Sequence, residues 1–190
     1  WLGTATGLMS YDRHADPAKR WKVFTNDPSD AGSLSADMVY TIQADPRDAN
    51  TLWIGTNGGG LNRLDKRTGR STRYSIKDGL PNDVVYGILT DDEGQLWMST
   101  NKGLARFSLA TGQFRSYDAS DGLQSDEFNR YAYCKATDGT LFFGGVKGFN
   151  HFHPRDLVDD TLAGAIRITG IKLINKVLDF RAGGAPLTMP

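Results

Sequence analysis

The sequence predicts an all-β fold built from one repeated unit of four short antiparallel strands. Three phrases recur along the chain in a constant order, and each repeat contains four short runs rich in β-branched and aromatic residues, separated by Gly, Asn and Asp. Nothing in these repeats sustains the periodicity of an α-helix. The chain has 190 residues, of which 39% are hydrophobic, so it can bury a sizeable core.

The first phrase begins with a large aromatic side chain. Its copies are WLGTATGLMSY at Trp1–Tyr11, LWIGTNGGGLNRL at Leu52–Leu64, LWMSTNKGLARF at Leu96–Phe107 and LFFGGVKGFNHF at Leu141–Phe152. The leading aromatic recurs about every 45 residues, a period typical of propeller blades. The first interval is longer, because an insertion rich in Asp, Pro and Ser follows Arg13 and predicts a surface loop. We expect the leading aromatics to pack between neighbouring units.

Two further phrases keep the same period. One reads LSADMVYTI at Leu34–Ile42, LPNDVVYGI at Leu80–Ile88 and LQSDEFNRY at Leu123–Tyr131, and the other reads TGRSTRY from Thr68 and TGQFRSY from Thr111. The run VVYGILTD is nearly all apolar, which predicts an inner strand buried on both faces. The run QFRSYD alternates as an edge strand would. The strands of each unit are therefore expected to run from the axis to the rim of a β-propeller blade.

These observations predict a partial β-propeller of about three to four four-stranded antiparallel blades. The propeller is expected over residues 1–158, with blade units at about 1–30, 31–77, 78–120 and 121–155.

The repeats resemble those of the two-component regulator propeller, which occur in the sensing region of bacterial hybrid two-component sensor histidine kinases. Gly79–Phe107, GLPNDVVYGILTDDEGQLWMSTNKGLARF, resembles the family repeat almost throughout. Asp121–Pro154 resembles the end of family propellers, so the resemblance implies that the chain holds the C-terminal blades. It also implies that residues 163–190 begin a truncated, β-sandwich-like, tyrosine-rich small domain, whose first strands lie in Ile166–Asp179.

The resemblance further implies a non-catalytic sensor module in the periplasmic or extracellular part of an inner-membrane protein. Such a module binds a ligand, or relays its presence, toward the membrane, and carbohydrate is one ligand class that the resemblance suggests. The partners implied are an oligosaccharide or other small ligand, the remaining blades and membrane-linked output domains of the full-length parent, and a second copy of the chain in a homodimer. Two other functions stay open: a propeller enzyme acting on polysaccharide, either a lyase or a glycosidase, and a protein-interaction scaffold.

Charge and cysteine content exclude several other functions. Lys plus Arg and Asp plus Glu both number 22, so no broad basic surface favours nucleic acid, and we predict no nucleic-acid partner. Cys134 is the only cysteine, which rules out an internal disulfide or a paired-cysteine metal site. His151 and His153 are expected on one strand face, but no third ligand follows at metal-binding spacing. We therefore predict neither a metal nor a cofactor.

The acidic residues fall at recurring positions. A propeller glycosidase would need acidic residues at nonrepeating loop positions, whereas the candidate carboxylates occupy equivalent places in three repeats, at Asp37, Asp83 and Asp126. A second set precedes predicted hairpin turns, at Asp45, Asp91 and Asp138. Recurrence favours a structural role, and we predict no catalytic residue.

A ligand site is expected on one face of the propeller. The loops that enter each inner strand and those that join the second strand to the third should gather there around the axis. This selects polar and aromatic residues, namely Asn57, Asp83, Asn101, Lys102, Asp126, Asn129, Arg130 and Tyr131. Amides, a guanidinium and an aromatic ring suit a carbohydrate. The alternative is that the Asn and Asp side chains only satisfy backbone amides of turns.

Overall fold

The computed structural model describes residues 1–157, 171–173 and 176–178. The chain divides into two compact units, Trp1–Leu157 and Val158–Pro190. In the second unit, β15 (Ile171–Leu173) and β16 (Lys176–Leu178) form an antiparallel pair. The rest of the small domain expected at 163–190 lies outside the described residues.

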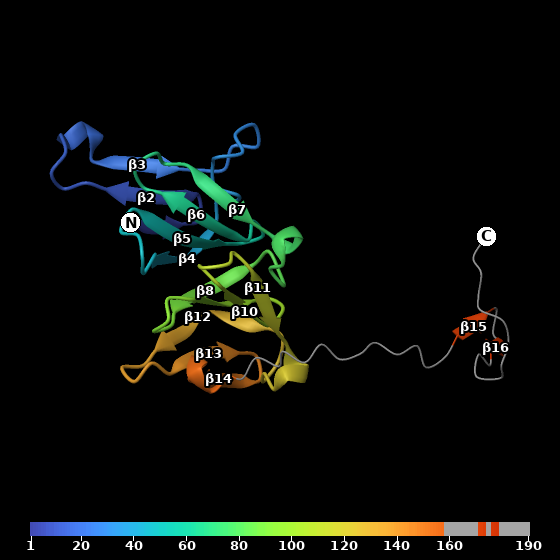
Figure 1. Cartoon of the computed structure of the whole chain (residues 1–190). Helices are drawn as coiled ribbons and strands as arrows, with labels where there is room; N and C mark the ends of the chain where they lie inside the picture. Colours follow the sequence, from blue (N-terminus) through green and yellow to red (C-terminus); the bar gives the residue numbers. More distant parts are fainter. Residues whose placement is uncertain (158–170, 174–175, 179–190) are drawn as a thin grey trace. The chain divides into compact units, whose positions relative to one another are not determined.

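The first unit consists of four antiparallel sheets, and within each sheet the strands follow one another in chain order (Figure 1). The first sheet contains β1 (Leu2–Thr4), β2 (Gly7–Tyr11) and β3 (Trp21–Phe24), and the second contains β4 (Val39–Ala44), β5 (Thr51–Thr56), β6 (Leu61–Asp65) and β7 (Ser71–Tyr74). The third contains β8 (Val85–Thr90), β9 (Leu96–Thr100), β10 (Leu104–Phe107) and β11 (Phe114–Tyr117), and the fourth contains β12 (Phe128–Lys135), β13 (Leu141–Gly145) and β14 (Gly148–Phe152). These sheets confirm the predicted all-β propeller fold.

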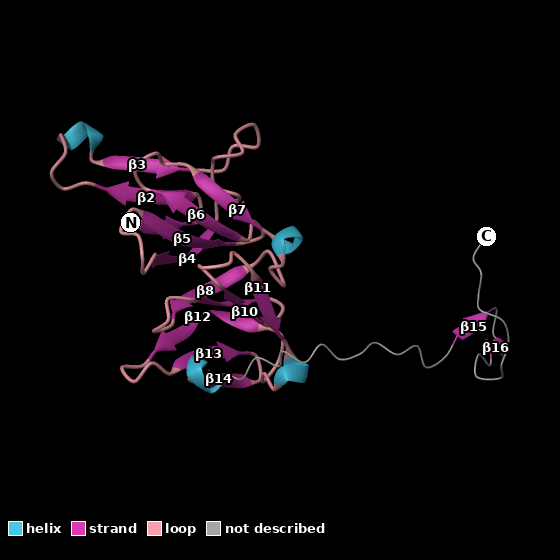
Figure 2. Cartoon of the chain, in the orientation of Figure 1, coloured by secondary structure: helices cyan, strands magenta, loops and turns pink. Residues whose placement is uncertain are grey.

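Four short 3₁₀ turns are the only helical elements of the described residues (Figure 2). They are η1 (Pro17–Lys19), η2 (Ile76–Asp78), η3 (Ala119–Asp121) and η4 (Pro154–Asp156). Both η2 and η3 follow the last strand of a blade and lead into the next inner strand, and each begins with a capping box, at Ser75 and Asp118. The repeat therefore includes its own connection between blades.

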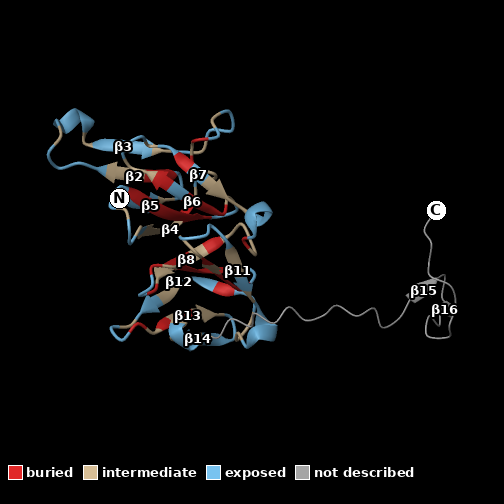
Figure 3. Cartoon of the chain, in the orientation of Figure 1, coloured by how far each residue is buried: buried red, intermediate tan, exposed pale blue. Residues whose placement is uncertain are grey.

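The second strand of a blade is the most buried one, and the first strand is not buried throughout, which corrects the expectation that the first strand is buried on both faces. Every residue of β5 and β9 is buried, whereas β4 and β8 alternate with half-buried positions (Figure 3). The reason is geometric. A second strand is hydrogen-bonded to a strand on either side within its own sheet, and a neighbouring sheet covers its faces. A first strand is hydrogen-bonded to only one strand of its own sheet.

Two of the four leading aromatics, Trp53 and Trp97, lock one sheet onto the next as expected. The Trp53 ring packs edge-on against Phe107 of the following blade at a centroid distance of 5.4 Å, and Trp97 packs against Phe152 at 4.9 Å. Both indoles are almost completely buried. Each such contact adds to the apolar area removed from water between the sheets. Phe142 instead contacts Phe149 of its own sheet, with centroids 6.3 Å apart.

The turn aspartates have a second role that the sequence did not reveal. The Asp91 carboxylate accepts backbone N–H groups from Glu93 at 3.0 Å and Gln95 at 2.8 Å, which fixes the hairpin turn. Its other oxygen accepts the Trp97 indole N–H at 2.9 Å, and Asp45 accepts that of Trp53 at 2.7 Å. The same carboxylate thus sets both the turn and the orientation of the interblade tryptophan.

Candidate functional site

The inner strands of three blades lie side by side, and each contains a bulge. In β4 and β8 the pairing register shifts between Val39 and Thr41 and between Val85 and Gly87. In β12 the irregular stretch is longer and extends from Phe128 to Tyr133. Because a bulge redirects side chains out of the regular alternation, these three stretches bring polar and aromatic groups to one place.

Four side chains form what we call the tyrosine–arginine cluster: Tyr40, Tyr86, Arg130 and Tyr131. The Tyr40 and Tyr86 rings stack with centroids 5.7 Å apart and an interplanar angle of 21°. The Arg130 guanidinium lies over the Tyr40 ring at 4.8 Å from its centroid and over the Tyr131 ring at 5.0 Å. The cluster therefore draws on the inner strands of all three blades, β4, β8 and β12.

Tyr131 has an uncommon backbone conformation. Its φ of 64° lies in the left-handed region, and it is the only non-glycine among the described residues with positive φ. For a tyrosine this costs on the order of 1 kcal/mol. The side chain gains no burial in return, since it is 70% exposed. Strain of this kind, kept at an exposed aromatic beside an arginine, is characteristic of a binding site.

Tyr86 keeps its hydroxyl as a hydrogen-bond donor. Burial raises its pKa above the usual value, and the neighbouring Tyr40 and Glu127 raise it further, against the opposing effect of Arg130. Its hydroxyl donates to Asn101 Oδ1 at 3.5 Å. The phenol is therefore protonated at neutral pH.

A second link between β12 and β4 lies beside the cluster. The hydroxyls of Tyr133 and Thr41 share a hydrogen bond of 2.9 Å, although β8 runs between their strands. The link passes over Gly87, where a Cβ atom would collide with the Tyr133 ring. Gly87 thus leaves room for a side chain of the fourth blade to reach the second blade.

The structure places the predicted site residues in two groups. Arg130 and Tyr131 belong to the cluster, Asn101 joins it through Tyr86, and Asn129 lies exposed next to Arg130 on β12. The other four have local roles, as follows. Asp83 and Asp126 accept the backbone N–H groups that open η2 and η3, at 2.9 and 2.8 Å, Asn57 contacts Met38, and the Lys102 amide donates to Thr100 Oγ1.

Asp37 accepts the Asn26 N–H at 2.6 Å in the same manner as Asp83 and Asp126. These three bonds support the structural role expected from their recurrence. Sequence reasoning missed Tyr40 and Tyr86, although a signal was present, because a tyrosine stands at the same place in MVYTI and VVYGI.

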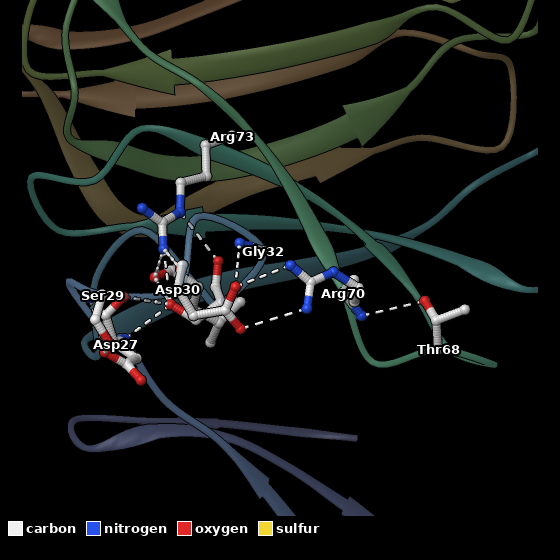
Figure 4. A network of polar contacts seen from close by, with 9 residues as sticks. Asp27, Ser29, Asp30, Gly32, Thr68, Arg70 and Arg73 are labelled. Carbon is white, nitrogen blue, oxygen red and sulfur yellow. Dashed lines mark hydrogen bonds and ion pairs between the residues drawn. The ribbon is translucent and has the colours of Figure 1, made fainter.

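A second polar region lies at residues 25–35, the part of the insertion that follows β3. Arg73 of β7 donates to the backbone carbonyls of Asp30 at 2.8 Å, Ser33 at 3.0 Å and Leu34 at 3.1 Å (Figure 4). Arg70 forms an ion pair of 2.8 Å with the Asp30 carboxylate, and together with the Gly32 N–H it holds the pKa of Asp30 below its usual value. The network fastens the insertion to the edge strand of the second blade.

The cavity beside this network has a volume of about 570 Å³. Charges of both signs line it, from Asp48, Arg63, Asp65, Arg67 and Arg70. Arg67 pairs with Asp65 at 3.5 Å, as Arg70 does with Asp30. Since most of these charges are compensated within the protein, the cavity is a weaker candidate than the tyrosine–arginine cluster.

The histidines and the cysteine do not form a joint site. His151 stacks on Phe142 at 5.7 Å, while His153 caps η4 through its Nδ1 atom, which accepts the Arg155 N–H at 3.2 Å. Cys134 is exposed on β12. No helix among the described residues has the length and apolar character needed to cross a membrane.

Comparison with known proteins gives three matches of different kinds. Residues 79–102 match the two-component regulator propeller model. A histidine kinase, P4, of Formosa agariphila is 26% identical over 99% of this chain, which spans 17% of the length of that kinase.

Solved structures of similar fold come from B. thetaiotaomicron. The extracellular domains of BT3049 and BT4673, which are assigned to hybrid two-component systems, superpose with TM-scores of 0.65 and 0.66 at 24% identity. The matches cover 80% and 82% of this chain but only 23% and 21% of those chains.

The antiparallel blades and their interblade aromatics define a β-propeller of the repeat-built class. Within that class, residues 79–102 match the two-component regulator propeller model, the family that the sequence resembles.

Proposed function

We propose that this chain is part of the sensing propeller of an extracytoplasmic two-component sensor, and that it receives a carbohydrate ligand at the tyrosine–arginine cluster. The observation that carries the proposal is the bulge of β12, where Arg130 lies over Tyr40 of the second blade and over the strained, exposed Tyr131 beside it. The Tyr40 ring stacks in turn on Tyr86 of the third blade. The likeness to the extracellular domains of two-component systems and to a histidine kinase supports the signalling role.

The chemistry of the cluster suits a sugar. Tyrosine rings offer flat apolar faces against which the C–H face of a pyranose can pack. Around them stand hydroxyl, amide and guanidinium groups, from Tyr86, Asn101 and Arg130, that can bond to sugar hydroxyls. A ligand that touches all three inner strands would also couple three blades, which is one way for binding to change how rigid bodies sit against each other.

The enzyme alternative receives less support from the geometry. The recurring carboxylates Asp37, Asp83 and Asp126 are each occupied by a backbone N–H group. A general acid or nucleophile must instead face the substrate.

The scaffold alternative is favoured by one observation. A shallow apolar cavity of about 430 Å³ lies on the β12–β14 sheet, lined in part by Phe142 and Phe149. Phe149 is 64% exposed. This face suits another propeller blade, from the parent or from a second copy of the chain, and it can serve that role together with ligand sensing.

The test is thermal unfolding of the 190-residue chain with and without a panel of neutral and acidic oligosaccharides. A ligand that binds the folded state raises the midpoint, by mass action. We expect a rise with at least one sugar, its loss in Tyr131→Ala, and its retention in Lys102→Ala, which removes an exposed side chain outside the cluster. If no sugar shifts the midpoint, the carbohydrate proposal is wrong.

A further inference from the structure

We infer that the ligand is an acidic sugar, and that Arg130 binds its anionic group while the tyrosine rings hold its pyranose ring. This inference rests on the proposed function and narrows it to a class of carbohydrate. Three features of the cluster carry it: the unpaired donors of Arg130, the way its guanidinium is held, and the arrangement of the rings.

The donors of Arg130 are available. Within the described part of the chain, neither a carboxylate nor a carbonyl oxygen accepts a hydrogen bond from its guanidinium, which contacts the Tyr40 and Tyr131 rings. Arg70 and Arg73, in contrast, donate hydrogen bonds to Asp30 in the insertion. A guanidinium presents five N–H groups in a planar fork, which matches the oxygens of a carboxylate or a sulfate.

The guanidinium is also held in place before any ligand arrives. The Arg130 guanidinium lies over the faces of two tyrosine rings, at 4.8 Å from the Tyr40 centroid and 5.0 Å from the Tyr131 centroid, and such contacts leave a cation able to bind an anion as well. Because two rings already restrict the side chain, binding an anion costs less side-chain entropy than it would at a free surface arginine. Hydrogen bonds between ions are about twice as strong as those between neutral groups, so a charged partner gains most from this arrangement.

The rings determine what carries the anion. Tyr40 and Tyr86 stack on each other, and the guanidinium that lies over Tyr40 also lies over the Tyr131 ring. A free inorganic anion would use the arginine but none of the ring surface. A pyranose that bears a carboxylate or a sulfate would use both, with the charge at Arg130 and the ring against a tyrosine.

The experiment is isothermal titration calorimetry of the full chain with two matched pairs of probes. The first pair is an oligogalacturonate and its methyl ester, which share their rings and differ in charge. The second pair is a sulfated galactan oligosaccharide and its desulfated form. We expect one charged member to bind about tenfold or more tightly than its neutral partner, with an affinity that falls as salt is raised. Which pair shows the preference identifies a uronate or a sulfated sugar.

Variants test whether Arg130 is the residue that binds the anionic group. Arg130→Gln should remove the preference for the charged probe, Arg130→Lys should keep part of it, and Lys22→Ala, which removes an exposed cation on β3, should leave it unchanged. If a neutral and a charged probe bind equally, or if Arg130→Gln retains the preference, the inference is overturned while a sugar-binding site remains. If none of the four probes binds, the inference is overturned and the carbohydrate proposal loses its support as well.

Discussion

The link from the fourth blade to the second across Gly87 makes a quantitative prediction about Gly87→Ala. Gly87 lies in the inner strand β8 and does not have a positive φ, so the backbone conformation there suits alanine as well. The added methyl group, however, would occupy the space of the Tyr133 ring. The ring must move, and its hydrogen bond to Thr41, of 2.9 Å, must lengthen or break.

The size of the effect follows from three contributions. Overpacking typically costs about 1–3 kcal/mol, and losing a hydrogen bond costs about 1 kcal/mol. Replacing a strand glycine by alanine returns about 0.5–1 kcal/mol of backbone entropy. We therefore expect Gly87→Ala to lower the free energy of unfolding by about 1–3 kcal/mol. Part of this cost arises because the hydroxyl of Thr41, a residue that is 4% exposed, loses its hydrogen-bond partner in a buried place.

A double-mutant cycle in urea, followed by tryptophan fluorescence, isolates the cause. In the Tyr133→Ala background the space over Gly87 is empty, so the same Gly87→Ala change should become neutral or stabilising by about 0.5 kcal/mol. Tyr133→Phe should cost only the hydrogen bond, about 1 kcal/mol. An equal destabilisation by Gly87→Ala in both backgrounds would refute the proposed passage of Tyr133 over Gly87.

Three further predictions follow from the blades. Asp91→Ala removes three hydrogen bonds at a buried turn and should cost about 3 kcal/mol or more by urea unfolding, whereas exposed Asp78→Ala at a capping box should cost about 1 kcal/mol. Trp97→Phe keeps an aromatic ring between the blades but leaves an oxygen of buried Asp91 unpaired, so the free energy of unfolding should fall by about 1–2 kcal/mol in the same assay. The double variant Trp97→Phe, Asp91→Asn should lose less. Lys135 holds the pKa of Asp92 below its usual value of 3.8, so this ion pair stabilises the fold above about pH 4, and the stabilisation is lost as the pH falls through the lowered pKa. Lys135→Met should therefore reduce the fall in melting temperature between neutral and acidic pH. An unchanged fall would contradict the pairing.

The sequence predicted the fold well because the repeat records it directly. The blades repeat their turn residues and their leading aromatic at a constant spacing, so strand order could be read from spacing alone. The prediction that the inner strand is buried on both faces was wrong because apolar content was taken as a measure of burial. VVYGILTD is more apolar than QLWMSTN, yet β9 carries Ser99 and Thr100 fully inside, since its position between two strands and two sheets decides its burial.

The candidate site was predicted only in part. Arg130 and Tyr131 were selected as polar and aromatic groups near the axis, but their partners Tyr40 and Tyr86 lie in other repeats, and spacing says nothing about which side chains meet across blades. The bulge in β12 is the physical cause of the meeting, and spacing does not reveal it, because twelve residues separate LQSDEF from LFF just as twelve separate LSADMV from LWI. Asp83 and Asp126 were selected by the same rule, and the structure gives them backbone partners instead.

The central claim is that a sugar binds at the tyrosine–arginine cluster, and chemical protection of Arg130 tests it most directly. The chain would be treated with phenylglyoxal, with and without the oligosaccharide that raises its unfolding temperature most, and the modification of each arginine would be measured by mass spectrometry. The account predicts that Arg130 reacts in the free chain and is protected by the sugar, while Arg155, which is also exposed, reacts equally in both. Equal modification of Arg130 with and without a saturating sugar would contradict it.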